Sequence, residues 1–363
     1  MSHAPVIDSP LIVPDGTTLI GESMTGAWLK GHVDFKSNSQ FTDLKIGPAS
    51  AGNSAITSAS GVTATATGFT RCHFRGGGGA GNGIAAGVIV LGAGRASNNI
   101  TFTDCDVECN LGTELGYPFS NSFNNIGIWQ TGLAAGAYIH HITFDGCHIG
   151  VSNGVRTGSP RMGMECWVAR VSEGGNGLGW SNVTVKDCVF EPTDVHNLDF
   201  ADSPDGRSNT VSVTGTNFKG GGLLAAGWGY GICVEYTTQA VISGNTFGRC
   251  SDSVIYVTHN EPIPARLPAT LITNNVIDAV TNNGVPLGDN PKCVLIGGYD
   301  NVFTGNTITV NYGDAVMDLR NGIDNTVTGN TFHCAAAQYT TPVKQWLGGS
   351  GNTITPNTKI LDQ

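Results

Sequence analysis

The sequence has little charge: charged residues make up 13% of its 363 residues, and 18 Lys and Arg stand against 28 Asp and Glu. The net charge of −10 leaves few groups to neutralise phosphates, and no basic stripe is present, so we expect no nucleic-acid partner. The longest apolar run, residues 83–94, is too short and too rich in glycine to span a bilayer, so we expect no membrane partner either.

The N-terminal residues also lack a basic segment followed by an apolar one, which predicts no signal peptide. The expected location is therefore virion-associated or cytoplasmic, or secreted if a signal was removed.

Glycine is abundant, at 52 residues, and apolar residues reach 40%. This composition is too apolar for a disordered chain, and no collagen-like period is present. Apolar residues alternate over short stretches bounded by Gly, Asn and Asp, which is typical of strands and turns, whereas helical periodicity is nearly absent. The sequence therefore predicts an all-β protein.

One short pattern recurs along the chain, as in FTRCHF, FDGCHI, ISGNTF and VTGNTF. Each copy has an apolar residue, two small or polar residues, an anchor, one further residue and a second apolar residue. A strand this short cannot bury its apolar face alone, so each coil must stack on the next, about 4.8 Å away. The pattern predicts a solenoid of three-sided coils. Its anchors are Cys72, Cys105, Cys147, Cys188, Thr216, Asn245, Asn275, Asn306 and Asn330.

The repeat predicts one domain, with residues 1–40 as an opening strand and N-terminal cap, 41–334 as coils, and 335–363 as a last coil and C-terminal cap. We expect the anchors to form one inward ladder in which stacked asparagines exchange hydrogen bonds and the cysteines stay reduced, because buried Cys acts as a small apolar residue. Disulfides are the alternative, because stacked neighbours approach bridging distance.

These coils, together with the VPDGTTLIG segment near the N-terminus, resemble the pectin-lyase-like superfamily of right-handed single-stranded parallel β-helices. The resemblance covers most of the chain. It implies a protein that handles polysaccharides along one face, as pectate lyases, polygalacturonases and phage tailspike depolymerases do, and tailspike-like members imply a homotrimer. The NTD, GHG and RIK motifs of polygalacturonases are absent, so no catalytic residue is carried over.

Three acidic residues occupy similar places in consecutive strands: Glu165, Asp199 and Glu235. On a stacked face they would lie close enough for one carboxyl to serve as general acid while another stays ionised, which is the arrangement that glycosidases use. We predict this column as the catalytic site. The alternative is that each is an outward strand residue on a polar face.

Long insertions and aromatic residues surround the same coils, and such insertions commonly build a binding face. Trp180, Trp228 and Tyr230 belong to this aromatic group, for which burial in the core is the alternative. Asp199, Asp202 and Asp205 could hold Ca²⁺, but a capped turn is favoured, and no cofactor is predicted. The predicted substrate-binding residues are Trp129, Trp167, Arg161, Arg207, Tyr236 and His259.

The sequence thus favours a glycoside hydrolase, a depolymerase, whose partner is a polysaccharide or cell-surface glycan. One alternative is a non-catalytic glycan-binding module of a phage tail or cell surface, which the missing catalytic motifs would suit. A polysaccharide lyase is the other, although the few Lys and Arg argue against its carbanion chemistry.

Overall fold

The computed structural model describes the parts of the chain from which the following account is built. They are residues 11–24, 26–47, 55–58, 64–76, 87–92, 97–109, 124–130, 139–150, 162–168, 180–201, 209–223, 229–235, 238–258, 270–281, 285, 287, 292–313, 315–335, 340–345 and 349–361. Contacts divide the chain into two compact units, residues 1–191 and 192–363, each of which is treated by itself. Within the described ranges there is no helix, and hence none long and apolar enough to cross a membrane.

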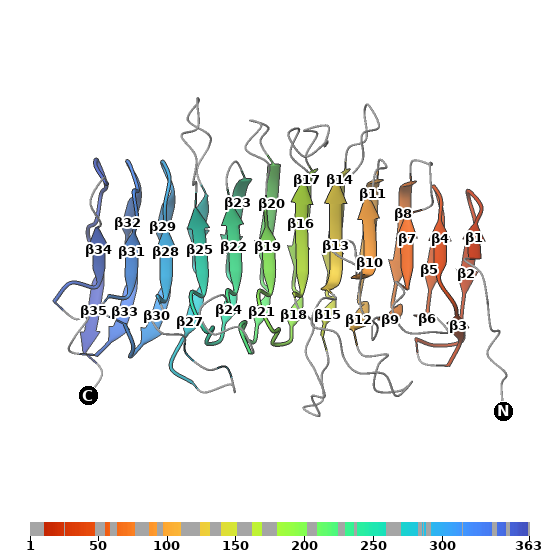
Figure 1. The fold of residues 1–363 in the computed structure, drawn as a ribbon, viewed down its shortest axis with the longest axis horizontal. Helices are drawn as coiled ribbons and strands as arrows, with labels where there is room; N and C mark the ends of the chain where they lie inside the picture. Colours follow the sequence, from red (N-terminus) through yellow and green to blue (C-terminus); the bar gives the residue numbers. More distant parts are fainter. Residues whose placement is uncertain are drawn as a thin grey trace. The chain divides into compact units, whose positions relative to one another are not determined.

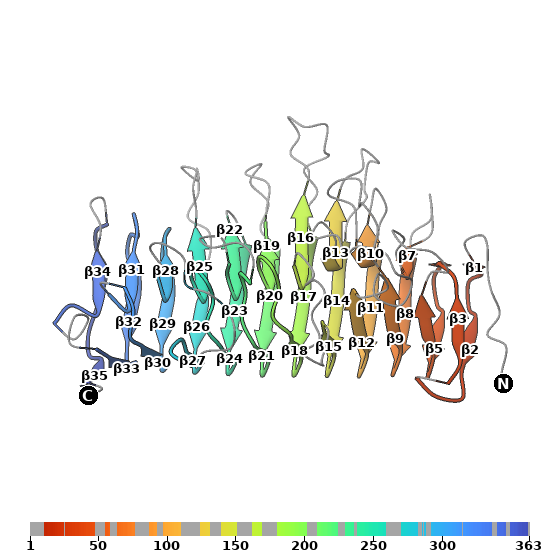
Figure 2. The same ribbon diagram turned by 60° about the horizontal axis from the view of Figure 1, so that its bottom comes forward.

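The first unit consists of coils that each contribute one strand to three parallel sheets (Figures 1 and 2). Sheet 1 contains β1 (Leu11–Val13), β4 (Val33–Phe35), β7 (Ile56–Ser58), β10 (Gly87–Gly92), β13 (Asn124–Gln130) and β16 (Met164–Val168). Sheet 2 contains β2 (Thr18–Ile20), β5 (Gln40–Thr42), β8 (Ala64–Thr70), β11 (Ser97–Thr103), β14 (Ile139–Asp145) and β17 (Trp180–Lys186). Sheet 3 contains β3 (Trp28–Lys30), β6 (Lys45–Gly47), β9 (His73–Gly76), β12 (Asp106–Cys109), β15 (His148–Ile149) and β18 (Val189–Phe190).

The second unit repeats this plan. Its sheet 1 contains β19 (Leu198–Phe200), β22 (Ile232–Glu235), β25 (Ile255–Thr258), β28 (Val294–Ile296), β31 (Met317–Leu319) and β34 (Val343–Gln345). Its sheet 2 contains β20 (Asn209–Thr214), β23 (Thr238–Ser243), β26 (Leu271–Thr273), β29 (Val302–Thr304) and β32 (Thr326–Thr328). Its sheet 3 contains β21 (Asn217–Phe218), β24 (Thr246–Phe247), β27 (Val276–Asp278), β30 (Thr307–Val310), β33 (Thr331–Cys334) and β35 (Thr358–Leu361). The predicted right-handed parallel β-helix is confirmed.

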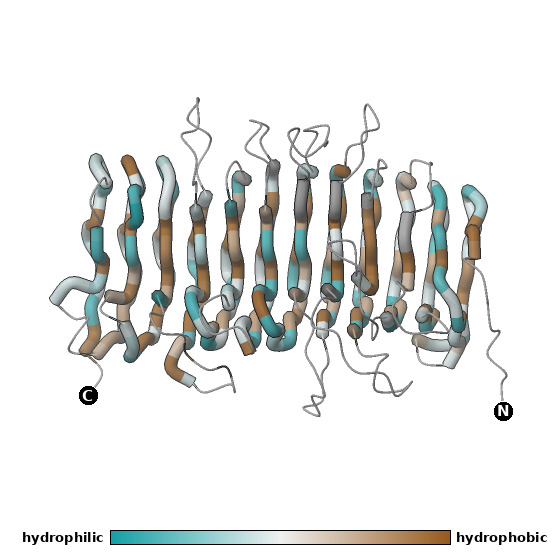
Figure 3. The backbone as a smooth tube through the Cα atoms, in the orientation of Figure 1, coloured by the Kyte–Doolittle hydropathy of each residue, from teal (hydrophilic) through white to brown (hydrophobic). Residues whose placement is uncertain are grey.

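Strand alternation places the core inside each coil, and Figure 3 shows hydrophobic and hydrophilic residues alternating along the strands. In the first unit one core position holds Phe41, Phe69, Phe102 and Phe144, which are at most 1% exposed. Their rings stack face to face in successive coils, with centroids 4.6, 4.9 and 4.6 Å apart. Such stacked pairs add about 0.5–1.5 kcal/mol each beyond the buried area. The column therefore keeps these coils in register.

The residue before each anchor adopts a left-handed backbone conformation at the turn between sheets 2 and 3. Asp104 has φ 51°, Gly146 has φ 66° and Asn274 has φ 57°. Gly, Asn and Asp tolerate this region best, which explains why they precede the anchors in the sequence. Arg71, at φ 48°, is an exception, and its side chain forms a two-bond ion pair with Asp43 of the preceding coil, with Nε–Oδ1 2.7 Å and Nη2–Oδ2 2.9 Å.

The anchors form a ladder in each unit, as predicted. In the second unit the side chain of Asn275 clamps the previous coil: its Oδ1 accepts from the backbone N–H of Asn245 at 2.9 Å, and its Nδ2 donates to the carbonyl of Ile242 at 2.9 Å. The same two bonds recur in later coils, and Asn357 extends the ladder by one step because it accepts from the backbone N–H of Asn330 at 2.9 Å. Each buried backbone group at the turn is thereby satisfied from the next coil.

Cysteine makes the same clamp in the first unit. The Cys105 sulfur accepts from the backbone N–H of Cys72 at 3.4 Å and donates to the carbonyl of Phe69 at 3.5 Å. Burial raises the pKa of Cys105, as it favours the protonated thiol that donates here. All ten cysteines of the chain are buried and unbridged, which confirms the prediction for the four cysteine anchors.

A second asparagine ladder, which the sequence analysis missed, lies between sheets 1 and 2 of the second unit. The backbone N–H of Asn301 donates to Asn325 Oδ1 at 2.8 Å, and that of Asn325 donates to Asn352 Oδ1 at 2.9 Å. The preceding Asp300, Asp324 and Gly351 are again left-handed. Two turns of each of these coils are therefore clamped by asparagine.

We predict that the clamp sets the stability of the second unit. Asn275→Ala leaves the buried N–H of Asn245 and the carbonyl of Ile242 without this partner, which should lower the free energy of unfolding by about 1–3 kcal/mol. Asn275→Cys should lose less, because cysteine makes the same two contacts in the first unit. Urea unfolding measures both; equal losses in the two variants would contradict the equivalence of thiol and amide.

Burial also predicts the behaviour of the thiols. In the native protein under non-reducing conditions a thiol reagent such as DTNB should react with few of the ten cysteines, and after denaturation it should react with all ten. Fewer free thiols after denaturation would mean that stacked cysteines are bridged and that the reduced ladder is wrong.

Candidate functional site

The predicted acidic residues lie on the outer side of sheet 1, where alternation turns every second side chain outward. Glu165 of β16 belongs to the first unit, lies opposite Gly127 of β13 and is 6% exposed. Asp199 of β19 and Glu235 of β22 belong to the second unit, and Asp199 is 8% exposed while Glu235 is half-buried. The pair that can be analysed within one unit is therefore Asp199 and Glu235.

The expected register of this pair is wrong by two residues. Asp199 lies opposite Cys233, and Glu235 lies opposite Thr258. The prediction paired residues that hold similar positions in the three sequence segments, whereas the observed strand pairing shifts Glu235 by two residues. The two acidic residues are thus diagonal neighbours, and a strand spacing of about 4.8 Å with a rise of about 3.3 Å per residue puts their Cα atoms about 8 Å apart.

Cys233 neighbours both acidic residues: it lies opposite Asp199 and two residues before Glu235 on the same strand. Its side chain points to the outer side, because Ile232 and Val234 point inward, yet it is only 1% exposed. Burial raises the pKa of Cys233 well above its usual value, and the charges and hydrogen bonds of Asp199 and Glu235 raise it further. A neutral thiol therefore adjoins both acidic residues.

An aromatic stack runs beside these residues. The rings of His196 and Tyr230 have centroids 4.6 Å apart at an interplanar angle of 2°, and those of Tyr230 and Tyr256 have the same values. The backbone N–H of Tyr230 donates to His196 Nδ1 at 3.3 Å. Burial raises the pKa of both phenols, so the hydroxyls remain neutral donors. Tyr230 was predicted as a member of the aromatic group, but the stack was not predicted, because its three residues are irregularly spaced along the chain.

Charged groups extend the face beyond the stack. Lys292 Nζ lies 3.5 Å from Asp318 Oδ2, and both side chains are buried. Burial raises the pKa of Asp252. The hydrogen bond from Ser253, and then the positive charges of Arg320 and Lys292, lower it. We call the outer side of β19, β22 and β25, with Asp199, Cys233, Glu235, Tyr230 and Tyr256, the acidic-aromatic face.

Several predicted binding residues cannot be placed in this face. Trp129 and Trp167 lie opposite each other in the register of β13 and β16 in the first unit, where only their backbone is described. Trp180 is wrong as a member of an exposed aromatic group: it is 0% exposed because it occupies an inward position of β17. Outside the described residues lie Arg161, Arg207, Tyr236, His259, Trp228, Asp202 and Asp205.

A second polar cluster, also missed by the sequence analysis, lies on the outer side of sheet 3 in the first unit. His148 Nε2 lies 2.9 Å from Glu191 Oε1, and its Nδ1 lies 3.9 Å from Asp106 Oδ1. Glu108 lies 3.3 Å from His73 Nε2 and 3.6 Å from Arg75 Nε in the neighbouring coil. Acidic groups here face cationic or protonatable partners, so the cluster is an internally paired network.

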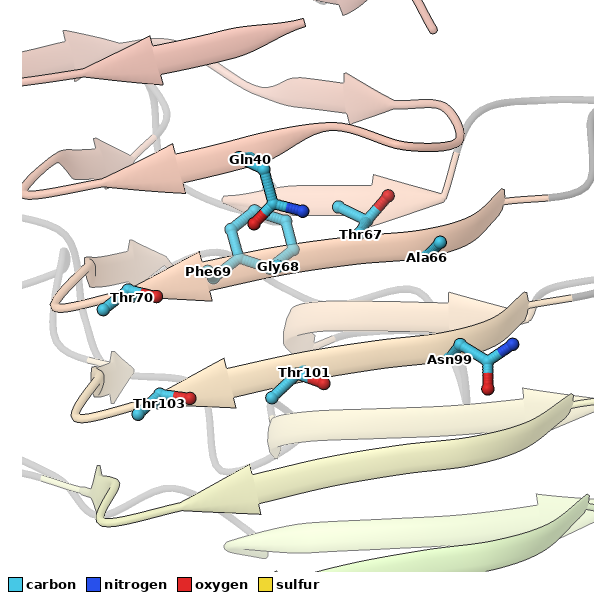
Figure 4. Close-up of a pocket in the computed structure, with 9 residues that line it drawn as sticks. All are labelled: Gln40, Ala66, Thr67, Gly68, Phe69, Thr70, Asn99, Thr101 and Thr103. Atoms are coloured by element: carbon cyan, nitrogen blue, oxygen red, sulfur yellow. The ribbon is translucent and has the colours of Figure 1, made fainter. Parts of the chain in front are cut away.

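A shallow hollow of about 260 Å³ lies over β8 and β11 of the first unit (Figure 4). Thr67, Thr101 and Thr103 line it, and Gln40 lies over Gly68, which has no side chain to fill the space. Its lining has hydroxyl and amide groups but no acidic or basic side chain. It offers hydrogen bonds to a ligand and no general acid or base.

Donors for a metal ion are scarce in this structure. Among the residues that it describes, no group of three or more His, Cys, Asp and Glu side chains could hold a metal ion. The ladder thiols, which are soft ligands in other proteins, here contact backbone carbonyls.

Comparison with solved structures gives the same fold. DFA-IIIase from Arthrobacter chlorophenolicus A6, in a mutant in complex with DFA-III, is 11% identical with a TM-score of 0.53 over 97% of this chain and 89% of that one. The same protein in complex with GF2 is 14% identical with a TM-score of 0.51 over 92% and 87%. The Dettilon tailspike protein, 13% identical with a TM-score of 0.46 over 98% and 61%, is more distant. At these identities the likeness shows the fold alone.

No curated protein matches the chain. A family model described as "Periplasmic copper-binding protein (NosD)" matches residues 170–360, which is more than half of the chain and includes the acidic-aromatic face. The chain therefore belongs to the NosD family of parallel β-helix proteins.

Proposed function

We propose that this protein is a glycoside hydrolase that cleaves a polysaccharide on the acidic-aromatic face of its second unit. The observation that carries the proposal is the diagonal pair of carboxylates, Asp199 and Glu235, on adjacent strands. Strand geometry puts their Cα atoms about 8 Å apart, from which the side chains can reach the separation of about 6.5–9.5 Å between carboxyl groups that leaves room for a water molecule in inverting enzymes.

Burial distinguishes the two roles. Asp199 is 8% exposed, and burial favours the neutral form of a carboxyl group, so Asp199 is assigned as the general acid that protonates the leaving oxygen. Glu235 is half-buried and more accessible to solvent, so it is assigned as the base that activates water. Their different surroundings supply the asymmetry that a two-carboxylate mechanism requires.

The aromatic stack supplies contacts of the kind a sugar needs. In a closed stack the ring faces cover one another, so the half-buried Tyr230 and Tyr256 present their edges and hydroxyl groups. Phenol hydroxyls held neutral by burial are donors and acceptors for sugar hydroxyls. Sugar binding along the stack would place a glycosidic bond beside the acidic pair.

The family description names copper, and the described residues do not fit a copper ion. Copper sites in proteins gather several imidazole, thiolate or thioether ligands, whereas no such group converges among the side chains described. The cysteine ladder offers protonated thiols that donate to carbonyls rather than thiolates aimed at a common point. No step of the proposed reaction is therefore assigned to a copper ion.

We predict that Asp199→Asn and Glu235→Gln each lower kcat at least a hundredfold, about the loss expected when a general acid or base is removed. The assay is reducing-end release from a panel of purified polysaccharides and oligosaccharides, including DFA-III and GF2. Circular dichroism of both variants should match that of the unmodified protein.

The matched control is Asp324→Asn, which changes a carboxylate in the turn after β31, where the left-handed backbone suits asparagine equally well. It should retain full activity. Undiminished sugar release by the Asp199 and Glu235 variants would refute the site assignment. Binding of a glycan without release by the unmodified protein would instead make it a non-catalytic binding module, and unsaturated products would make it a lyase.

A further inference from the structure

Cys233 differs from the ladder cysteines in its surroundings. Cys105, Cys147 and Cys188 donate to backbone carbonyls inside the coils of the first unit. Cys233 instead lies on the outer side of β22 and is closed off from solvent by its neighbours, with 1% of its surface exposed. A buried thiol on the polar side of a sheet therefore needs an explanation other than core packing.

Titratable groups face this thiol from each neighbouring strand of its unit. Asp199 lies opposite it in β19, and Tyr256 lies opposite it in β25. Glu235 follows two residues later on the same side of β22, and Tyr230 lies just before the strand. Burial raises the pKa of the thiol, and Asp199 and Glu235 raise it further. Cys233 is thus a side chain that adjoins both members of the acidic pair.

We propose that Cys233 is a positioning residue for hydrolysis: its S–H group donates to the ionised carboxylate of Glu235, and its sulfur accepts from the protonated carboxyl group of Asp199. This inference rests on the proposed function of the acidic pair. The thiol is suited to the task because burial and the two acidic residues keep it protonated. It adds no second negative charge beside Glu235, and it cannot be drawn into the reaction as a thiolate nucleophile.

The chemistry predicts a direction for the pH dependence. A hydrogen bond to the ionised form of a carboxyl group favours ionisation, and the loss of that bond disfavours it. Without the thiol the base, Glu235, would take up its proton at a higher pH. The acidic limb of the kcat/KM profile should therefore move to higher pH when the thiol is removed.

The test compares Cys233→Ala, which removes the donor, with Cys233→Ser, which retains one. We expect Cys233→Ala to lower kcat about tenfold, as for the loss of a hydrogen bond to a charged group, with KM within about twofold and the acidic limb moved upward. Cys233→Ser should restore most of kcat and the original limb. Cys334→Ala, which removes a buried thiol at the end of β33, is the control and should leave both unchanged.

A second measurement does not depend on turnover. The infrared S–H stretching band of Cys233, isolated as the difference between the unmodified protein and Cys233→Ala, should shift in Asp199→Asn and in Glu235→Gln. A band that does not move in either variant overturns the proposal, whatever the activity.

The kinetic outcomes separate the two hypotheses. If the acidic variants lose activity while Cys233→Ala keeps the original kcat and pH profile, the proposed function stands and the role of Cys233 is refuted. If Cys233→Ser is as impaired as Cys233→Ala, the donor is not what matters and the role is again refuted. If the unmodified protein releases no sugar from any substrate, the proposed function fails, and the positioning role fails with it even when the infrared band moves.

Discussion

The structure depends on a side-chain clamp at the turn between sheets 2 and 3. At that turn a buried backbone N–H has no partner within its own coil, and the next coil supplies one from the side chain of its anchor. The same side chain donates back to a carbonyl of the earlier coil, so each clamp makes two bonds across one coil spacing. Because an unsatisfied buried N–H is costly, coils can stack only where the anchor is in register.

The clamp also explains why cysteine and asparagine share one position. Both side chains are short and carry a hydrogen-bond donor and an acceptor. The thiol makes weaker hydrogen bonds than the amide in both roles. In the first unit the cysteine column is accompanied by stacked phenylalanines, whereas asparagine in the second unit is supported by a second asparagine ladder. The weaker thiol clamp is thus accompanied by a column of four stacked phenylalanine rings, and the amide clamp by a second ladder of the same kind.

The fold could be predicted from the sequence because the clamp needs particular residues. At each of these turns a residue in the left-handed conformation precedes the anchor. The repeat therefore shows Gly, Asn or Asp directly before Cys or Asn, as at Asp104 and Cys105. The site could be predicted only in part. Asp199 and Glu235 were predicted as a column of acidic residues, but their diagonal register was not, because the repeat aligns the anchors and not the strands of sheet 1.

Two other features of the structure could not be predicted from the sequence. An outward His or Glu in a strand looks the same whether it is solvated or paired across coils, so the network around His148 and Glu191 was missed. Trp180 was assigned to a surface group because tryptophan suits both a core and a sugar-binding face, and only alternation within β17 distinguishes the two. Outward side chains are constrained by neighbouring coils, which are distant in sequence.

A fixed coil spacing makes the outer faces rigid supports, and the account places catalysis on one of them. The most direct test is a crystal structure of the Glu235→Gln variant with a bound oligosaccharide that the unmodified protein cleaves. The account predicts sugar along Tyr230 and Tyr256, with a glycosidic oxygen within hydrogen-bonding distance of Asp199. Sugar bound instead at the threonine-lined hollow over β8 and β11, or at the network around His148, with nothing beside Asp199, would contradict it.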